Sequence, residues 1–102
     1  MVGEQLTFMG RLGKEPDLRY TFRGGKPVCY LAVAENKTGC DKPVWRRVVV
    51  FGKQAELAKV DLKKGSQIFI QGHCTIREYK DGNGQTRNIE EVNAKLIGFP
   101  NV

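Results

Sequence analysis

Turn-forming residues divide this sequence into short segments, and this feature limits its possible folds most strongly. Glycine, proline, asparagine and aspartate recur between runs of alternating or continuous apolar residues, the pattern of β-strands joined by turns. One helical stretch is predicted over 53–64, with Gly65 at the position of a C-terminal cap. The runs rich in branched and aromatic residues predict five strands, over 6–12, 28–35, 44–51, 67–79 and 88–97.

The order of these elements predicts the fold class. Three strands, a helix and two strands form an all-β OB-fold, a five-stranded partly open barrel with one short helix between strands 3 and 4. Segment 80–84 contains both Asp-Gly and Asn-Gly, so the last two strands are expected to form an extended hairpin. A generic five-stranded α+β sheet is the alternative. At 102 residues, the chain is expected to form one domain over 1–102.

Charge and composition narrow the class of partner. Lysine and arginine number 17 against 11 acidic residues, a net charge of +6 that attracts polyanions such as nucleic acid or an anionic membrane surface. The same charge is also compatible with ordinary solubility. No apolar run is long enough for a membrane span, and the N-terminus does not resemble a secretory signal. Three cysteines without a C-x-x-C pair indicate a reducing cytoplasm, with no disulfide framework and no zinc pattern.

The sequence offers little for catalysis. Ser66 is the only serine and His73 the only histidine, and no acid is arranged to orient that histidine in a nucleophilic triad. Glu90 and Glu91 are neighbours in a strand and therefore point to opposite faces. No phosphate-binding glycine motif is present. We therefore expect no enzyme, no metal and no cofactor.

The predicted third strand carries aromatic rings beside a cation. With a period of two, Trp45, Arg47 and Phe51 share one face, while Val48 and Val50 share the other with the look of a barrel interior. Burying Arg47 without a partner would cost several kcal/mol, so its face is expected to be wet. Exposed rings beside cations are typical of proteins that bind single strands regardless of sequence. The alternative is that both rings are core and that Arg47 reaches outward.

The other strands add candidates. In the fourth strand, an aliphatic face runs from Ile68 to Ile76, and Cys74 on it is expected to be buried, as is Cys29 in the second strand. On the opposite faces lie Tyr30, a weaker stacking candidate, and a polar-aromatic set near the predicted hairpin. That set is Arg77 and Tyr79, with Lys80 and Arg87 across the turn. The alternative for these cations is ordinary solvated hairpin charge.

Four segments resemble the bacterial-type single-stranded DNA-binding protein family. They read GRLGKEPDLRY over 10–20, WRRVVVFGKQAE over 45–56, LKKGSQIFIQG over 62–72 and TIREYKDGNGQ over 75–85. These segments fall in register along nearly the whole chain, and the resemblance rests on their combination. The resemblance implies an OB-fold that binds single-stranded DNA without sequence preference in replication, recombination or repair. It also implies a homo-oligomer, more often a tetramer than a dimer, associated with the bacterial nucleoid. Weaker RNA binding stays open.

The resemblance also implies residue roles. It places Trp45, Phe51 and Tyr79 at base-stacking positions, and Phe69 and Gln67 on the strand of the subunit contacts. Arg46 stands where members usually have a histidine at that interface. The cations that match or adjoin the DNA path are Arg47, Lys53, Lys64, Arg77 and Arg19.

This sequence departs from the family pattern in two further places. The loop after the second strand is short, and Asn36 or Lys37 stands where many members carry another aromatic. The chain also stops at residue 102 without the acidic tail of cellular members, as in a tailless or a trimmed form, so tail-mediated recruitment of replication enzymes is not expected. Two alternatives are kept: a primosomal replication protein of the related tailless OB family that bridges helicase-loading partners, and an OB module whose aromatics bind protein.

Overall fold

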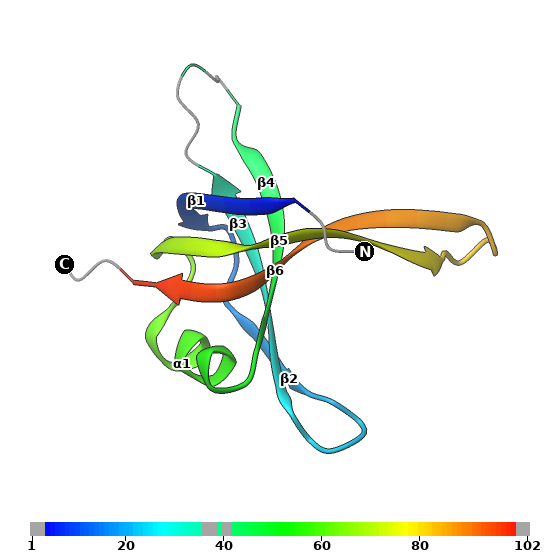
Figure 1. Cartoon of the computed structure of the whole chain (residues 1–102), viewed down its shortest axis with the longest axis horizontal. Helices are drawn as coiled ribbons and strands as arrows, with labels where there is room; N and C mark the ends of the chain where they lie inside the picture. Colours follow the sequence, from blue (N-terminus) through cyan, green and yellow to red (C-terminus); the bar gives the residue numbers. More distant parts are fainter. Residues whose placement is uncertain (1–3, 36–38, 40–41, 100–102) are drawn as a thin grey trace.

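The computed structural model describes residues 4–35, 39 and 42–99 (Figure 1). Asn36, Lys37 and Cys40 lie outside the described residues. The chain forms six strands and one helix within the described part. Their bounds are β1 Gln5–Leu12, β2 Asp17–Tyr20, β3 Pro27–Glu35, β4 Val44–Phe51, α1 Lys53–Asp61, β5 Gln67–Lys80 and β6 Thr86–Gly98.

Five of the strands close into a barrel. β1 pairs with both β3 and β5, β5 pairs with β6, and β3 pairs with β4, all antiparallel. The ring is completed by a short parallel contact between β4 and β6, Val48 opposite Val92 and Val49 opposite Asn93. Because this last pairing is so short, the barrel is only partly closed between β4 and β6. The predicted OB-fold, with its helix between the third and fourth barrel strands and a long final hairpin, is confirmed.

Apart from shifts of one or two residues at strand ends, two elements differ from the sequence-based prediction. The short strand β2 was not predicted; its four residues form a strand because each pairs with β3, from Asp17 opposite Tyr30 onward. The helix ends at Asp61 instead of residue 64, since Leu62 is extended and buries its side chain in the core. Gly65, predicted as the helix cap, lies in the following turn with a φ of 89°, where its N–H donates to the carbonyl of Leu12 at 2.8 Å.

The barrel interior is the aliphatic face that the alternation predicted. Phe8 of β1 packs inside it, as expected. Cys29 is also buried there, as expected, and burial raises the pKa of its thiol to about 11. The prediction was wrong for Ile76, which is 70% exposed, and for Cys74, which is only half-buried. Both lie where β5 leaves the barrel. The core hydrophobic residues with 3% exposure or less are Leu12, Cys29, Leu31, Val33, Val48, Val50, Ala55, Ala58, Ile68, Ile70 and Val92.

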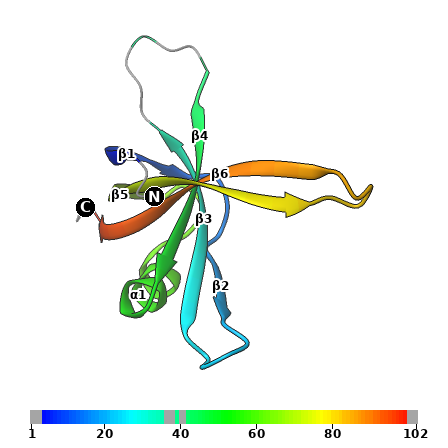
Figure 2. The ribbon, with the colours of Figure 1, turned by 45° about the vertical axis from the view of Figure 1, so that its right-hand side comes forward.

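The β5–β6 and β2–β3 hairpins extend beyond the barrel (Figure 2). The β5–β6 arm remains paired from Ile76 opposite Glu90 to Lys80 opposite Thr86. The β2–β3 arm leaves the barrel in another direction, beside α1 (Figures 1 and 2). Within the described part of the chain, no helical segment has the length and apolar character that crossing a bilayer requires.

Candidate nucleic-acid interface

The outer face of β4 presents its rings to solvent. Trp45 is 58% exposed and Phe51 is 53% exposed, as predicted, so the alternative that both rings are core is wrong. The register with β3 explains how such large side chains fit, because Trp45 lies opposite Ala34 and Arg47 opposite Ala32. Small side chains on β3 thus leave room on this face for the indole and the guanidinium.

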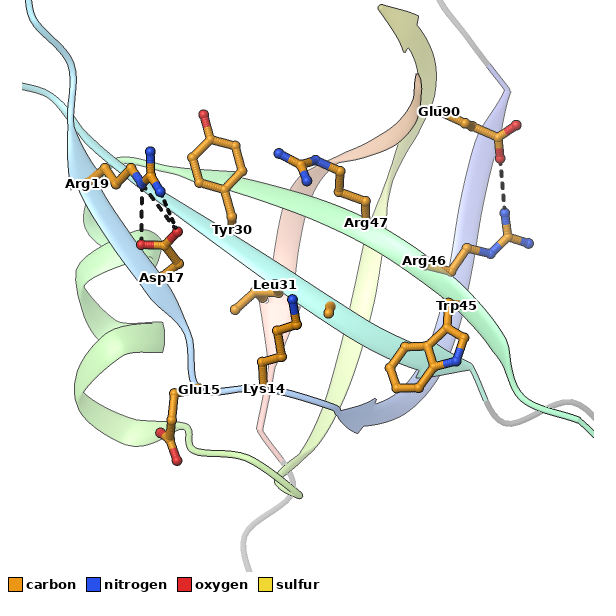
Figure 3. A pocket seen from close by; sticks show the side chains of 11 residues that line it. Lys14, Glu15, Asp17, Arg19, Tyr30, Leu31, Trp45, Arg46, Arg47 and Glu90 are labelled. Atoms are coloured by element: carbon orange, nitrogen blue, oxygen red, sulfur yellow. Dashed lines mark hydrogen bonds and ion pairs between the residues drawn. The ribbon is translucent and has the colours of Figure 1, made fainter. Parts of the chain in front are cut away.

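A groove of about 530 Å³ opens on this face (Figure 3). Figure 3 shows Trp45 and Tyr30 on two sides of it, with Arg47 between them. The groove therefore brings together four predicted DNA-binding residues, which are these three and Arg19 of β2, with Arg46, which was predicted at the subunit interface. Its full lining is Lys14, Glu15, Asp17, Arg19, Tyr30, Leu31, Ala32, Trp45, Arg46, Arg47 and Glu90.

Gly13 supports the indole of Trp45. A Cβ atom on Gly13 would lie 2.5 Å from both Cη2 and Cζ3 of Trp45, so the ring rests where any larger residue would stand. The backbone of Gly13 is itself fixed, because its N–H donates to the carbonyl of Ala32 at 2.9 Å. Gly13 therefore sets the position of the exposed ring.

Replacing Gly13 with alanine tests this support. Gly13 lies outside the positive-φ region, so alanine fits its backbone, but the new methyl group must displace the indole. We expect Gly13→Ala to lower the affinity for oligo-dT by about 3- to 10-fold, a loss of roughly 1 kcal/mol within the usual value of one base stack. The change in unfolding free energy should stay below about 1 kcal/mol. Titration of a labelled oligonucleotide measures the first and urea denaturation the second.

The control is the same substitution without the ring. In a Trp45→Ala background, Gly13→Ala should change the affinity hardly at all, because the two residues act through one contact. Equal losses in both backgrounds would contradict the supporting role of Gly13.

A buried carboxylate orders the arginines of this face. Glu91 of β6, only 8% exposed in its side chain, accepts a hydrogen bond at 2.7 Å from Nε of Arg47 and another at 3.1 Å from Nε of Arg77. The guanidinium of Arg47 also lies 5.2 Å from the ring centre of Tyr30. Glu91 thus joins β4, β5 and β6 beside the groove.

Sequence reasoning missed the role of Glu91. Arg47 was expected to need water or a partner, but the partner comes from the parallel contact between β4 and β6, which local alternation does not reveal. The neighbouring Glu90 points to the other face, as predicted, where it pairs with Arg46 at 3.4 Å. Arg46 also pairs with Glu35 at 2.9 Å.

The ion pairs of Glu91 predict a pH dependence of stability. Burial alone would raise its pKa, but the hydrogen bonds and charges of Arg77 and Arg47 outweigh burial and hold the pKa below its usual 4.5. A carboxyl with a depressed folded pKa contributes stability above its unfolded pKa, and that stability is lost as the pH falls through the folded pKa. Glu91→Gln should remove this contribution and cost about 1–2 kcal/mol at pH 7.

Urea denaturation at several pH values checks the Glu91 prediction. The difference between wild type and Glu91→Gln should be constant near neutral pH and shrink below about pH 4.5. Glu78→Gln, on the exposed hairpin face, is the matched control and should follow the wild type. A difference between wild type and Glu91→Gln that stays the same down to acid pH would show that the ion pairs contribute nothing.

The remaining predicted cations divide into paired and unpaired groups. Arg19 pairs with Asp17 at 3.1 Å, and Arg87 pairs with Asp81 at 2.9 Å, where it helps to hold the hairpin turn. The hydrogen bond from Arg87 is the main reason that the pKa of Asp81 is lowered. Among the described residues, no carboxylate forms an ion pair with the candidate lysines Lys53, Lys64 and Lys80, or with Lys14, which the sequence reasoning did not single out.

The other candidates lie outside the groove. Phe51 and Lys53 lie at the end of β4 and the start of α1, and Tyr79 is 42% exposed on the β5–β6 arm. Phe69 and Gln67 are half-buried where β5 pairs with β1, apart from the groove lining. Trp45, the strongest stacking candidate, therefore lies in the groove with Tyr30, whereas Phe51 and Tyr79 lie in two different directions from it.

The barrel and its groove, which combines exposed aromatic rings with arginine and lysine side chains, define the class as an OB-fold with the features of a nucleic-acid-binding protein. Residues 4–100 match the Single-strand binding protein family, and the chain belongs to that family. Proteins of this family bind DNA and are not enzymes.

Proposed function

We propose that this protein binds single-stranded DNA without sequence preference, with bases stacked on Trp45 and Tyr30 in the groove. The observation that carries the proposal is the half-exposed indole of Trp45, supported by Gly13 and placed beside Arg47. Every base has a π-face, so stacking on a ring adds about 1–3 kcal/mol per base whatever the sequence.

Phe51 and Tyr79 extend the proposed path at its two ends. Phe51 lies six residues beyond Trp45 on the same face of β4, about 20 Å away at roughly 3.3 Å per residue. Tyr79 lies on the hairpin arm with Arg77, on the face that carries Glu91. The proposed strand therefore runs along β4 and continues toward the arm.

Phosphate contacts are assigned to different cations according to their pairing. Arg47 and Arg77 are oriented by Glu91 and share its one negative charge, so the trio retains a charge of about +1 for phosphate. Lys14, Lys53, Lys64 and Lys80 form no ion pair with a carboxylate among the described residues, so their ammonium groups are assigned to contacts with the DNA backbone along the path. Arg19 and Arg87 contribute less in this proposal, because each already pairs with an aspartate.

Assembly into a homo-oligomer, a tetramer more than a dimer, is part of the proposal. Phe69 and Gln67 are its proposed contacts, and exposed apolar side chains beside them support this assignment. Met9, 40% exposed, lies opposite Phe69 on β1, and Leu96 is half-exposed opposite Gln71. Arg46, proposed at the same interface, is engaged within the chain by Glu35 and Glu90.

The proposed role is protection of exposed single strands during replication, recombination or repair at the nucleoid, with RNA bound more weakly. Mass measurement with and without a long dT oligonucleotide tests binding, stoichiometry and assembly together. We expect an oligomer that forms a defined complex with oligo-dT and a weaker one with oligo-U. A dimer with negligible affinity for dT would overturn the proposal and favour the primosomal alternative.

Salt dependence tests the phosphate contacts. The logarithm of the binding constant should fall linearly with the logarithm of salt concentration, by about 0.7 per neutralised phosphate. A binding constant independent of salt would exclude the lysines and arginines from the contact.

A further inference from the structure

The turn between β2 and β3, residues 21–26 and called the β2–β3 tip below, carries an aromatic ring that the groove does not use. Phe22 is fully exposed there, and Tyr20 at the end of β2 is 57% exposed. An exposed phenylalanine forgoes most of the free energy that burial would supply. A ring in this position has no role in the stability of the barrel.

The β2–β3 tip is closed by hydrogen bonds that leave the ring outside. Thr21 donates its N–H to the carbonyl of Lys26 at 2.8 Å and accepts the N–H of Gly25 at 3.2 Å. Its hydroxyl donates to the carbonyl of Arg23 at 2.8 Å and accepts the N–H of Lys26 at 2.9 Å. Gly24 and Gly25 have positive φ values of 85° and 58°, which allow the chain to turn. The presentation of Phe22 is therefore built into the turn.

The charge of the β2–β3 tip has one sign. Arg23 and Lys26 lie in the same turn as Phe22, and residues 18–26 contain no acidic side chain. Across the described part of the chain, neither cation forms an ion pair with a carboxylate. An exposed ring with two unpaired cations in the same turn is complementary to a base and its neighbouring phosphates.

The β2–β3 tip is continuous with the proposed DNA path. Phe51 lies opposite Val28 on β3, and Val28 lies opposite Arg19 on β2. The N–H of Gly52, directly after Phe51, donates to the carbonyl of Pro27 at 3.0 Å, at the base of the turn. A strand that passes Trp45 and Phe51 is therefore led to the arm that ends in the tip (Figure 2).

We propose that the β2–β3 tip is a second contact site for single-stranded DNA, at which Phe22 stacks on a base while Arg23 and Lys26 bind the adjacent phosphates. The inference rests on the proposed function and extends it beyond the groove. A strand long enough to reach from the groove to the tip gains this contact, and a strand that fills only the groove does not.

Oligonucleotide length separates the two sites. OB-folds bind about 4–16 nucleotides, so dT of about 5 and about 16 nucleotides serve as the short and long probes. Phe22→Ala should weaken binding of the long probe by about 5- to 150-fold, the usual effect of losing one stacked base, and leave the short probe unchanged. Val60→Ala is the matched control, because Val60 is also an exposed apolar residue but lies on α1.

The phosphate contacts of Arg23 and Lys26 are tested by a separate measurement, the salt dependence of binding. Replacing Arg23 and Lys26 together by alanine should reduce the salt dependence for the long probe, by about 0.7 in the log-log slope per lost phosphate contact. Thermal unfolding of each variant checks that the barrel is intact.

The outcomes distinguish the two proposals. If Trp45→Ala weakens binding of both probes while Phe22→Ala changes neither, the groove is the binding site and the tip proposal is overturned. The same result is expected if the exposed ring of Phe22 contacts a protein partner instead of DNA. If Phe22→Ala weakens both probes equally, the ring does not form a separate site. If the wild type binds neither probe, the proposed function itself fails.

Discussion

Replacing Trp45 with alanine is expected to lower the affinity for oligo-dT by about 5- to 150-fold, equivalent to about 1–3 kcal/mol for one stacked base. The ring is more than half exposed, so its removal takes little apolar surface from the folded protein. The unfolding free energy should therefore change by less than about 1 kcal/mol. Fluorescence anisotropy of a labelled dT oligonucleotide measures the affinity.

A surface variant away from the groove provides the comparison for Trp45→Ala. Leu57 of α1 is 47% exposed and lies outside the groove lining, so Leu57→Ala removes a similar type of surface without touching the proposed path. It should bind oligo-dT as the wild type does. If both variants bind equally well, Trp45 has no role in binding.

Replacing Gly72 with alanine is expected to destabilise the barrel by about 3 kcal/mol. A Cβ atom on Gly72 would lie 2.2 Å from the carbonyl oxygen of Asn93 and 2.9 Å from Cα of Ala94, both backbone atoms of β6. Backbone atoms in a paired strand have no room to withdraw, so β5 and β6 must separate locally, with a cost at the upper end of overpacking. The site lies at the irregularity in the β5–β6 register, between Gln71 and Gly72.

Gly82 supplies the matched glycine-to-alanine control. A Cβ atom there would meet nothing within 4 Å, and Gly82 lies outside the positive-φ region. Gly82→Ala should change the unfolding free energy by less than about 0.5 kcal/mol. Urea denaturation of both variants measures the contrast, and equal stability of the two would contradict the close approach of β5 and β6.

The fold was largely predictable because period-two alternation is a local property. The aliphatic residues that alternate in β3, β4 and the first half of β5 point into the barrel in the structure. Alternation alone does not reveal where β5 leaves the barrel, so Ile76 was wrongly assigned to the interior. The strand β2 was missed because its four residues depend on pairing with β3.

The site was predictable where the chemistry of a single residue determines its surroundings. Arg47 between two rings required solvent or a partner, and this argument placed its face outward. The partner, Glu91, is distant in sequence and arrives through the parallel seam between β4 and β6. Gly13 supports Trp45 through a contact that no local pattern encodes.

The most direct test of the central claim uses the intrinsic fluorescence of Trp45, which is the only tryptophan in the sequence and lines the groove. Titration with oligo-dT should lower this fluorescence until the binding sites are saturated, because a base stacked on the indole quenches its excited state. A duplex of the same length should quench it far less, since its bases are already stacked. If oligo-dT binds while the fluorescence stays constant, the strand does not occupy the groove and the account is contradicted.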